Sequence, residues 1–321
     1  MTVSRVMNES GYISQDARAR VNQAISELGY MPNALARQLR SRQTRTIALV
    51  VTDIGNPFFT EIARGVEDTA GARGYAVMFW NTYGSETQEA EYVRVLIERR
   101  VDGVLLVPAC GGGSSVPLLR EHHIPTVVLD RHVGDVEVDE VRADSRAGAY
   151  AAVSHLTALG HRRIALLTGP EAVSTSTDRV AGYREALQEA CPTGDCDQVL
   201  FGEFNEPSGY AMMVQALQAR PRPTAILAAN NLVAVGAMRA LREAGFEIPH
   251  DISIVVFDDL PPGWVLDPFL TVVSQPAYDI GSRAAALLLK RLGRAAPGGH
   301  SSIVLPSQLI VRQSAAPPRI D

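Results

Sequence analysis

This sequence of 321 residues is poor in cysteine and has no long apolar run. Its three cysteines are too few for a disulfide framework, so we expect reduced thiols and a cytoplasmic protein. No apolar stretch approaches the roughly 20 residues that a helix needs to span a bilayer. The N-terminus also lacks the basic segment and apolar core of a secretory signal. These absences predict a cytoplasmic protein with no membrane partner.

Motifs for catalysis and for metal binding are also missing. Residues 110–115 (CGGGSS) follow a predicted strand, but they lack the lysine and the spacing of a phosphate-binding loop. Cys191 and Cys196 have no second cysteine pair or histidine cluster nearby that could complete a zinc site, and no G-x-S-x-G elbow occurs. We therefore expect no metal, no cofactor and no enzymatic activity. A sugar kinase or isomerase stays an alternative, which turnover of sugars with ATP would reveal.

Positive charge is concentrated at the N-terminus. Residues 1–45 carry seven arginines against three carboxylates, a net charge of +4, although the whole chain has a net charge of −5. The remaining residues therefore carry −9. A basic arm on an acidic body indicates a polyanionic partner for the arm alone. A solvated run of surface charge is the alternative interpretation.

Residues 46–59 (TIALVVTDIGNPFF) begin a long α/β repeat. The apolar, β-branched run 47–51 is typical of a strand buried on both faces of a parallel sheet, and Pro57 suits the first turn of a helix. Strands then alternate with helices of about 10–15 residues, which predicts parallel α/β architecture. The predicted strands are residues 47–51, 75–80, 103–107, 125–129, 163–167, 199–201, 224–228, 253–257 and 303–311. Two units of similar size predict two doubly wound parallel-sheet lobes with a cleft between them.

The segment before this repeat is predicted to be helical. Residues 2–8 have apolar side chains at helical spacing, and Ser14 can cap a second helix that ends at Gly29. Asn33 can cap a third short helix, ALARQLR, before the polar linker 41–45. Helices this short are marginal in water, so the third would form only against a partner.

Polar and aromatic side chains recur at the ends of the predicted strands of the repeat. Carboxylates, arginines and amides occur there at residues 130–131, 179, 230–231 and 258–259, and phenyl rings at residues 58, 59 and 204. These groups offer acceptors, fork-shaped donors and apolar faces, which suits a small neutral polyol such as a sugar. Strand ends expose polar groups in any protein, so ordinary solvent exposure is the alternative interpretation for each single residue.

Several segments resemble the lactose-repressor/galactose-repressor (LacI/GalR) family of bacterial transcription regulators. The matching segments are TVSRVMN, ARARVNQAISELGYMPNALARQLR, TRTIALVVTDIGNPFFTEIARGVEDTA, ANNLVAVGAMRAL, FDDLPPGWVLDPFLTVVSQP and LPSQLIVRQS. The resemblance covers essentially the whole chain. It implies a DNA-binding regulator, most often a repressor, with a helix-turn-helix, a hinge helix and a core similar to periplasmic sugar-binding proteins. A small effector in the cleft would change the affinity for operator DNA.

The resemblance also implies the division of the chain. We expect a headpiece at 1–31, a hinge helix and linker at 32–45, a first core lobe at 46–145 and 277–301, a second core lobe at 146–276 and 302–313, and a tail at 314–321. The tail has no heptad pattern, so a homodimer is expected and not a coiled-coil tetramer.

Site residues follow from the same resemblance. The effector-contacting positions are Asn56, Phe58, Phe59, Asp130, Arg131, Thr175, Arg179, Phe204, Asn230, Asp258 and Gln275. This set is more similar to the cleft of the ribose-binding protein than to that of the purine repressor, so a pentose or related sugar is expected. The DNA-contacting positions are Thr2, Val3, Ser4, Arg5 and Asn8 in the recognition helix, and Ala36 and the minor-groove wedge Leu39 in the hinge helix.

The chain departs from the family pattern at two places. The family headpiece begins with a segment resembling I-x-D-V-A-x-x-A-G-V-S, and this chain starts after it, so we expect an incomplete helix-turn-helix and weak DNA binding. Asn231 stands where the family often has Asp, which removes a charge near the cleft but keeps an acceptor. The alternative function is a stand-alone solute-binding protein, which predicts a signal peptide and no basic arm.

Overall fold

The computed structural model describes residues 6, 13–28, 43–110, 115–134, 136–191, 197–260, 267–293 and 298–319. The chain divides into two compact units, Met1–Thr44 and Arg45–Asp321, which we describe separately. In the first unit, α2 (Gln15–Glu27) begins at Ser14, whose hydroxyl accepts the N–H of Ala17 at 3.3 Å. The predicted cap is therefore confirmed. The DNA-contacting positions predicted above, Thr2, Val3, Ser4, Arg5, Asn8, Ala36 and Leu39, lie outside the described residues.

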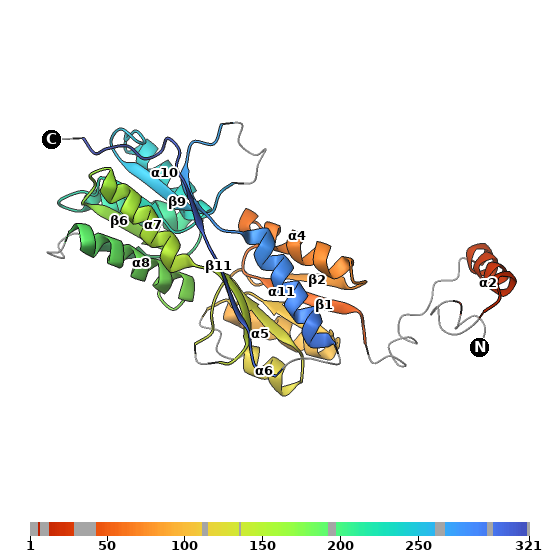
Figure 1. The fold of residues 1–321 in the computed structure, drawn as a ribbon. Coiled ribbons are helices and arrows are strands. Elements are labelled where there is room, and N and C mark those ends of the chain that lie inside the picture. The colour runs from red at the N-terminus through yellow and green to blue at the C-terminus, as the bar shows by residue number, and fades with distance from the viewer. Residues whose placement is uncertain are drawn as a thin grey trace. The chain divides into compact units, whose positions relative to one another are not determined.

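The second unit contains two six-stranded sheets among its described residues (Figure 1). The first sheet has the order β11-β5-β4-β3-β1-β2, from β1 (Thr46–Val51), β2 (Ala76–Asn81), β3 (Gly103–Leu106), β4 (Thr126–Leu129), β5 (Asp139–Ala143) and β11 (Ser302–Leu305). The second has the order β12-β10-β9-β8-β6-β7, from β6 (Ile164–Thr168), β7 (Asp197–Phe201), β8 (Ala225–Ala228), β9 (Ser253–Phe257), β10 (Thr271–Ser274) and β12 (Gln308–Ile310). Neighbouring strands are parallel except β12, which runs antiparallel to β10. The predicted fold of two parallel-sheet lobes is confirmed.

Helices cover both faces of each sheet. In the first lobe α4 (Pro57–Gly71) and α11 (Ala277–Leu292) pack on one face, and α5 (Glu86–Glu98) and α6 (Ser115–Glu121) on the other. In the second lobe α7 (Ser145–Ala158) and α8 (Ser174–Ala190) form one pair, and α9 (Glu206–Gln218) and α10 (Asn231–Glu243) form the other. Side chains of a central strand alternate between the two faces, so strands such as β1 are apolar throughout.

Close approach of α4 and α11 requires glycine at their crossing. A Cβ added at Gly65 would collide with the carbonyl oxygen of Tyr278, and one added at Gly281 would collide with that of Ile62. Figure 1 shows α11 beside α4. Since α11 follows β10 of the second lobe in the chain, this helix returns the polypeptide to the first lobe.

Three expectations about strands are wrong. β5 and β10 were not among the predicted strands, and the single strand expected at 303–311 is divided into β11 and β12. The interruption contains Pro306, which lacks the N–H that a continuing ladder would need. β11 pairs with β5, so residues 302–305 belong to the first lobe and not, as expected, to the second. The chain therefore crosses between lobes after β5, after β10 and after β11.

The cysteines differ from expectation at one position. Cys110 is a free thiol, as expected. Cys191, at the end of α8, is disulfide-bonded, so the prediction of a reduced thiol is wrong there. Among the described residues, no helix combines the length and apolarity needed to cross a membrane.

Candidate functional site

A cavity of about 440 Å³ lies between the two lobes. Its lining comes from the segments that follow β1, β2, β3 and β4 in one lobe and β6, β7, β8, β9 and β10 in the other. The carboxyl ends of parallel strands meet at one edge of a sheet, and ligands of open α/β sheets bind at that edge. The topology thus turns the two sheet edges toward one shared cleft.

All eleven effector positions expected from the sequence lie in this lining. They are Asn56, Phe58, Phe59, Asp130, Arg131, Thr175, Arg179, Phe204, Asn230, Asp258 and Gln275. Sequence reasoning missed ten further lining residues, namely Thr52, Asp53, Tyr83, Gly84, Ala109, Cys110, Pro170, Val173, Glu203 and Asn205. All ten lie within five residues after the end of a strand, so their position after a predicted strand was the available signal. Asn231 and Asp259 share that position but are not part of the lining.

Two arginines and two aspartates form the charged centre of the cavity. Arg131, Arg179, Asp130 and Asp258 are each buried to more than nine-tenths. Arg131 Nη1 donates to the carbonyl oxygens of Pro108 at 2.5 Å and Ala109 at 2.6 Å, and Arg179 Nη1 donates to that of Ala229 at 2.6 Å. The Nε atoms of both arginines are buried and have no hydrogen-bond acceptor among the described residues. Each guanidinium is therefore held by backbone carbonyl oxygens and keeps one buried donor without an acceptor among the described residues.

The two aspartates occupy equivalent places in the two lobes. Asp130 follows β4 and Asp258 follows β9, and each has a left-handed backbone, with φ of 65° and 70°. Their amides donate to Val141 and Val273 of the adjacent strands, both at 3.0 Å. Left-handed backbone is strained for residues other than glycine and concentrates at functional sites. In both lobes the chain turns sharply at the sheet edge and directs a carboxylate into the cleft.

Burial controls the protonation of this centre. Desolvation raises the pKa of Asp258 to about 6, although Arg179 and the Gln275 amide, which donates at 2.6 Å, favour the ionised form. Desolvation also raises the pKa of Asp130, against the attraction of Arg131. The guanidinium pKa values of Arg131 and Arg179 are lowered by the same burial, but arginine stays protonated in proteins. The centre thus keeps its cations, while Asp258 titrates near physiological pH.

Aromatic rings complete the lining. The ring of Phe204 lies 6.0 Å from Cζ of Arg131 and 5.9 Å from Cζ of Arg179, and the guanidinium of Arg179 lies 4.2 Å from the ring of Phe257. Phe58 and Phe59 pack edge to face with centroids 5.2 Å apart. Apolar faces beside charged donors and acceptors match a molecule with an apolar ring face and hydroxyls at its edge.

Gly169 makes room for Phe204. A Cβ at this position would overlap the Phe204 ring, so we expect Gly169→Ala to push the ring into the cavity and to weaken ligand affinity about tenfold, as overpacking typically costs 1–3 kcal/mol. Isothermal titration calorimetry would measure this loss. Gly71→Ala is the matched control, because a Cβ there meets no atom within 4 Å. Equal affinity of Gly169→Ala and wild type would show that the ring position is unimportant.

Glu89 supports the site from behind. This carboxyl on α5 is buried, and it accepts the amide of Ala109 at 2.6 Å and a hydrogen bond from the Ser115 side chain. Desolvation raises its pKa. The carbonyl oxygen of Pro108, which belongs to the same peptide unit as the Ala109 N–H, accepts from Arg131, so this one peptide is fixed between the two charged groups. Sequence reasoning missed Glu89, because a glutamate in the first turn of a helix is an ordinary surface residue.

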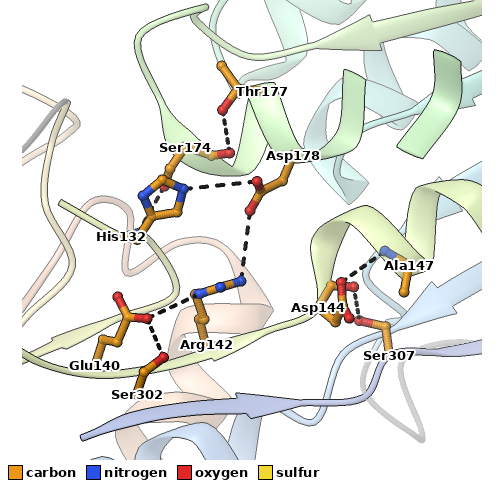
Figure 2. A network of polar contacts seen from close by, with 10 residues as sticks. All are labelled: His132, Glu140, Arg142, Asp144, Ala147, Ser174, Thr177, Asp178, Ser302 and Ser307. Atoms are coloured by element: carbon orange, nitrogen blue, oxygen red, sulfur yellow. Dashed lines mark hydrogen bonds and ion pairs between the residues drawn. The ribbon is translucent and has the colours of Figure 1, made fainter. Parts of the chain in front are cut away.

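A polar network links the lobes near the crossing segments (Figure 2). The backbone N–H of His132 donates to the Ser174 hydroxyl at 3.0 Å. Asp178 of α8 lies 3.9 Å from both His132 Nε2 and Arg142 Nη1 of the first lobe. Partly exposed ion pairs at such distances contribute little free energy. These contacts can therefore break and re-form when the lobes move.

A metal site is not found in the part of the chain that the structure describes. No three histidine, cysteine, aspartate or glutamate side chains are placed there to hold an ion.

Family models match two parts of the chain. Residues 44–308 match the model described as periplasmic binding proteins and sugar binding domain of LacI family. Residues 1–33 match the model described as bacterial regulatory proteins, lacI family. The first match contains the whole cavity lining.

Individual proteins are similar over nearly the full length. The ribose operon repressor of Halalkalibacterium halodurans is 37% identical over 98% of this chain and 92% of its own. The transcriptional repressor CytR of Escherichia coli is 33% identical over the same shares, 98% and 92%. Among solved structures, a LacI family transcriptional regulator from Enterococcus faecium with bound ribose matches with a TM-score of 0.76 and 31% identity, over 85% of this chain and 100% of that one. A complex of the transcriptional regulator CelR with cellobiose matches with a TM-score of 0.77 and 33% identity, over 97% and 94%.

Proposed function

This chain belongs to the LacI family of bacterial regulatory proteins, and from that premise we propose that it is a DNA-binding transcriptional repressor controlled by a small effector. The effector is a pentose or a related sugar, bound in the inter-lobe cavity. The protein acts in the cytoplasm as a homodimer and has no enzymatic activity. Residues 1–31 form its DNA-reading headpiece, 32–45 its hinge, and the two lobes its sensor.

The buried charged centre carries the effector part of this proposal. The residues that line the cavity with the two aspartates include two arginines whose buried Nε donors lack acceptors among the described residues, and Gln275, whose side-chain oxygen lacks a donor there. Hydroxyl groups of a sugar donate to carboxylates and accept from guanidinium groups, so a polyol satisfies both sets at once. An anionic ligand would satisfy only the arginines and would be repelled by the aspartates. Two similar proteins, the ribose operon repressor and the ribose-bound regulator, support a pentose.

A ligand screen tests the effector assignment. We expect ribose or a related pentose to raise the melting temperature of the chain in a thermal-shift assay, with hexoses, polyols, purines and nucleosides as the other members of the panel. Calorimetry on each compound that gives a shift then provides Kd. If purines or nucleosides bind and no sugar does, the sugar assignment is wrong. If no member of the panel binds, the proposal of a small polyol effector fails.

The DNA-binding part rests on the match of residues 1–33 to the family model and on the arginine-rich N-terminal arm. We propose that Thr2, Val3, Ser4, Arg5 and Asn8 contact bases and phosphates in the major groove. Ala36 and Leu39 act in the minor groove, with Leu39 inserted into a base step.

An electrophoretic mobility-shift assay tests this part. The probes are DNA fragments from upstream of the gene and its neighbours. We expect sequence-specific binding that changes when the effector is added. Absence of specific binding, with and without the effector, would contradict the function as a regulator and favour a stand-alone solute-binding protein.

A further inference from the structure

A buried hydrogen bond joins the two lobes at the edge of the cavity. Asn231 Nδ2, on the first residue of α10 in the second lobe, donates to Asn56 Oδ1 in the first lobe at 3.1 Å. Asn231 is 5% exposed and Asn56 is 3% exposed. Asn56 lines the cavity, whereas Asn231 does not. Breaking a buried hydrogen bond of this kind costs more free energy than breaking the partly exposed ion pairs of Figure 2.

The orientation of both amides follows from a second contact. Asn56 caps α4, and its Oδ1 accepts the N–H of Phe58 at 2.9 Å. The oxygen of Asn56 is thereby fixed as an acceptor, so the group that Asn231 turns toward it must be a donor. The other end of the Asn231 amide, Oδ1, is buried without a partner among the described residues.

A carboxylate at position 231 could not make this contact. Aspartate has nearly the same size and shape as asparagine, but its ionised form only accepts hydrogen bonds. It would place a buried negative charge against the Asn56 oxygen, which cannot turn away without losing the cap of α4. Asn231 is also the position where the sequence departs from the aspartate that the resembling family often has. At position 231 this chain therefore carries an amide that donates a hydrogen bond, in place of a carboxylate that can only accept one.

We propose that Asn231 is the residue that sets how readily the cleft closes in this protein, through its donor contact to Asn56. The inference rests on the proposed function, because closure matters only if the cavity holds an effector. A closed cleft positions Asn56, Phe58 and Phe59 against the groups of the second lobe, so a ligand that contacts both lobes binds more tightly when closure is favoured. Asn231 is a positioning residue and touches no ligand.

Substitutions at position 231 test the proposal in the full chain. We expect Asn231→Asp to weaken ribose binding, measured by calorimetry, by about tenfold or more, and Asn231→Ala by a few-fold, since removal of a donor costs less than a buried unpaired charge. If Asn231 acted only at the start of α10, Asn231→Asp would stabilise the helix and leave ribose affinity unchanged, because a carboxylate at a helix N-terminus is favourable. Unchanged or raised thermal stability together with lost affinity would therefore identify the inter-lobe contact. Affinity of Asn231→Asp within twofold of wild type would overturn the proposal.

A measurement without ligand separates this inference from the proposed function. Spin labels attached through non-canonical residues at the exposed positions Glu121 on α6 and Gln215 on α9 report the distance between the lobes. We expect the ligand-free Asn231→Asp chain to show a longer or broader distance distribution than wild type. Identical distributions would overturn the inference even if ribose binds. If Asn231→Asp changes the inter-lobe distance distribution but the protein binds no compound of the panel, the result supports the contact as a determinant of closure and contradicts only the effector assignment.

Discussion

Replacing Arg179 by alanine is expected to abolish effector binding while both lobes stay folded. The guanidinium of Arg179 is 4% exposed, is held by the Ala229 carbonyl and lies over the Phe257 ring. Its Nε has no hydrogen-bond acceptor among the described residues, and the positive charge of the guanidinium compensates the charges of Asp130 and Asp258. Truncating one member of a buried, hydrogen-bonded charge set costs about 2–5 kcal/mol or more. We therefore expect the affinity measured by calorimetry to fall by about 30-fold or more.

Two matched variants separate this effect from a loss of folding. Arg184→Ala removes an arginine from the same helix, but Arg184 is exposed and pairs with Asp197 outside the cavity, so its affinity should equal that of wild type. Arg179→Lys keeps the charge but loses the planar fork, and we expect it to bind weakly. Circular dichroism and thermal unfolding would verify that all three variants are folded. Affinity of a folded Arg179→Ala chain equal to wild type would remove Arg179 from the site.

Effector affinity is expected to fall in mild acid because of Asp258. Its pKa of about 6 means that the carboxyl is ionised at pH 7.5 and protonated at pH 5. A protonated carboxyl loses an acceptor for ligand hydroxyls and no longer balances Arg179. Each pH unit below 6 should then weaken binding about tenfold, until the protonated form binds with its own lower affinity. Calorimetry between pH 5 and pH 8 in buffers of matched ionic strength would give this profile.

The stability of the ligand-free chain should respond to the same proton in the opposite direction. Since the folded-state pKa of Asp258 lies above its ordinary value of 3.8, the folded chain takes up a proton between about pH 6 and pH 4 that the unfolded chain does not. This carboxyl therefore favours folding progressively as the pH falls through that window. Asp258→Asn should bind weakly with a flat pH profile. A wild-type affinity that is independent of pH between 5 and 7.5 would contradict a role for ionised Asp258.

Much of the cavity could be predicted from the sequence because strand ends are local features. The apolar runs at β1, β4, β8 and β9 mark buried parallel strands, and the residue that follows each run stands at the sheet edge by necessity. Asp130 and Asp258 are examples, each directly after a run of buried residues. Within each sheet, parallel connectivity then places such residues at one edge although they lie far apart in the sequence.

Short strands without an apolar run were not predictable in this way. β5 has the sequence DEVRA with alternate residues half-exposed, and β10 has four residues ending in a half-exposed serine. Their strand character depends on the neighbours β4 and β9, with which they pair. β11 likewise belongs to the first lobe because it pairs with β5, and a strand's partner is not encoded within the strand itself.

The sequence by itself determined the alternation of strands and helices, the basic N-terminal arm and the chemical inventory of the sheet edges, since all of these depend on residues close together in the chain. Only the tertiary structure decided which lobe β11 joins, that Glu89 fixes the Pro108–Ala109 peptide that holds Arg131, and that Asn231 donates to Asn56. Each of these is a pairing between residues distant in sequence. Its free energy depends on burial and orientation, which exist only after the chain has folded.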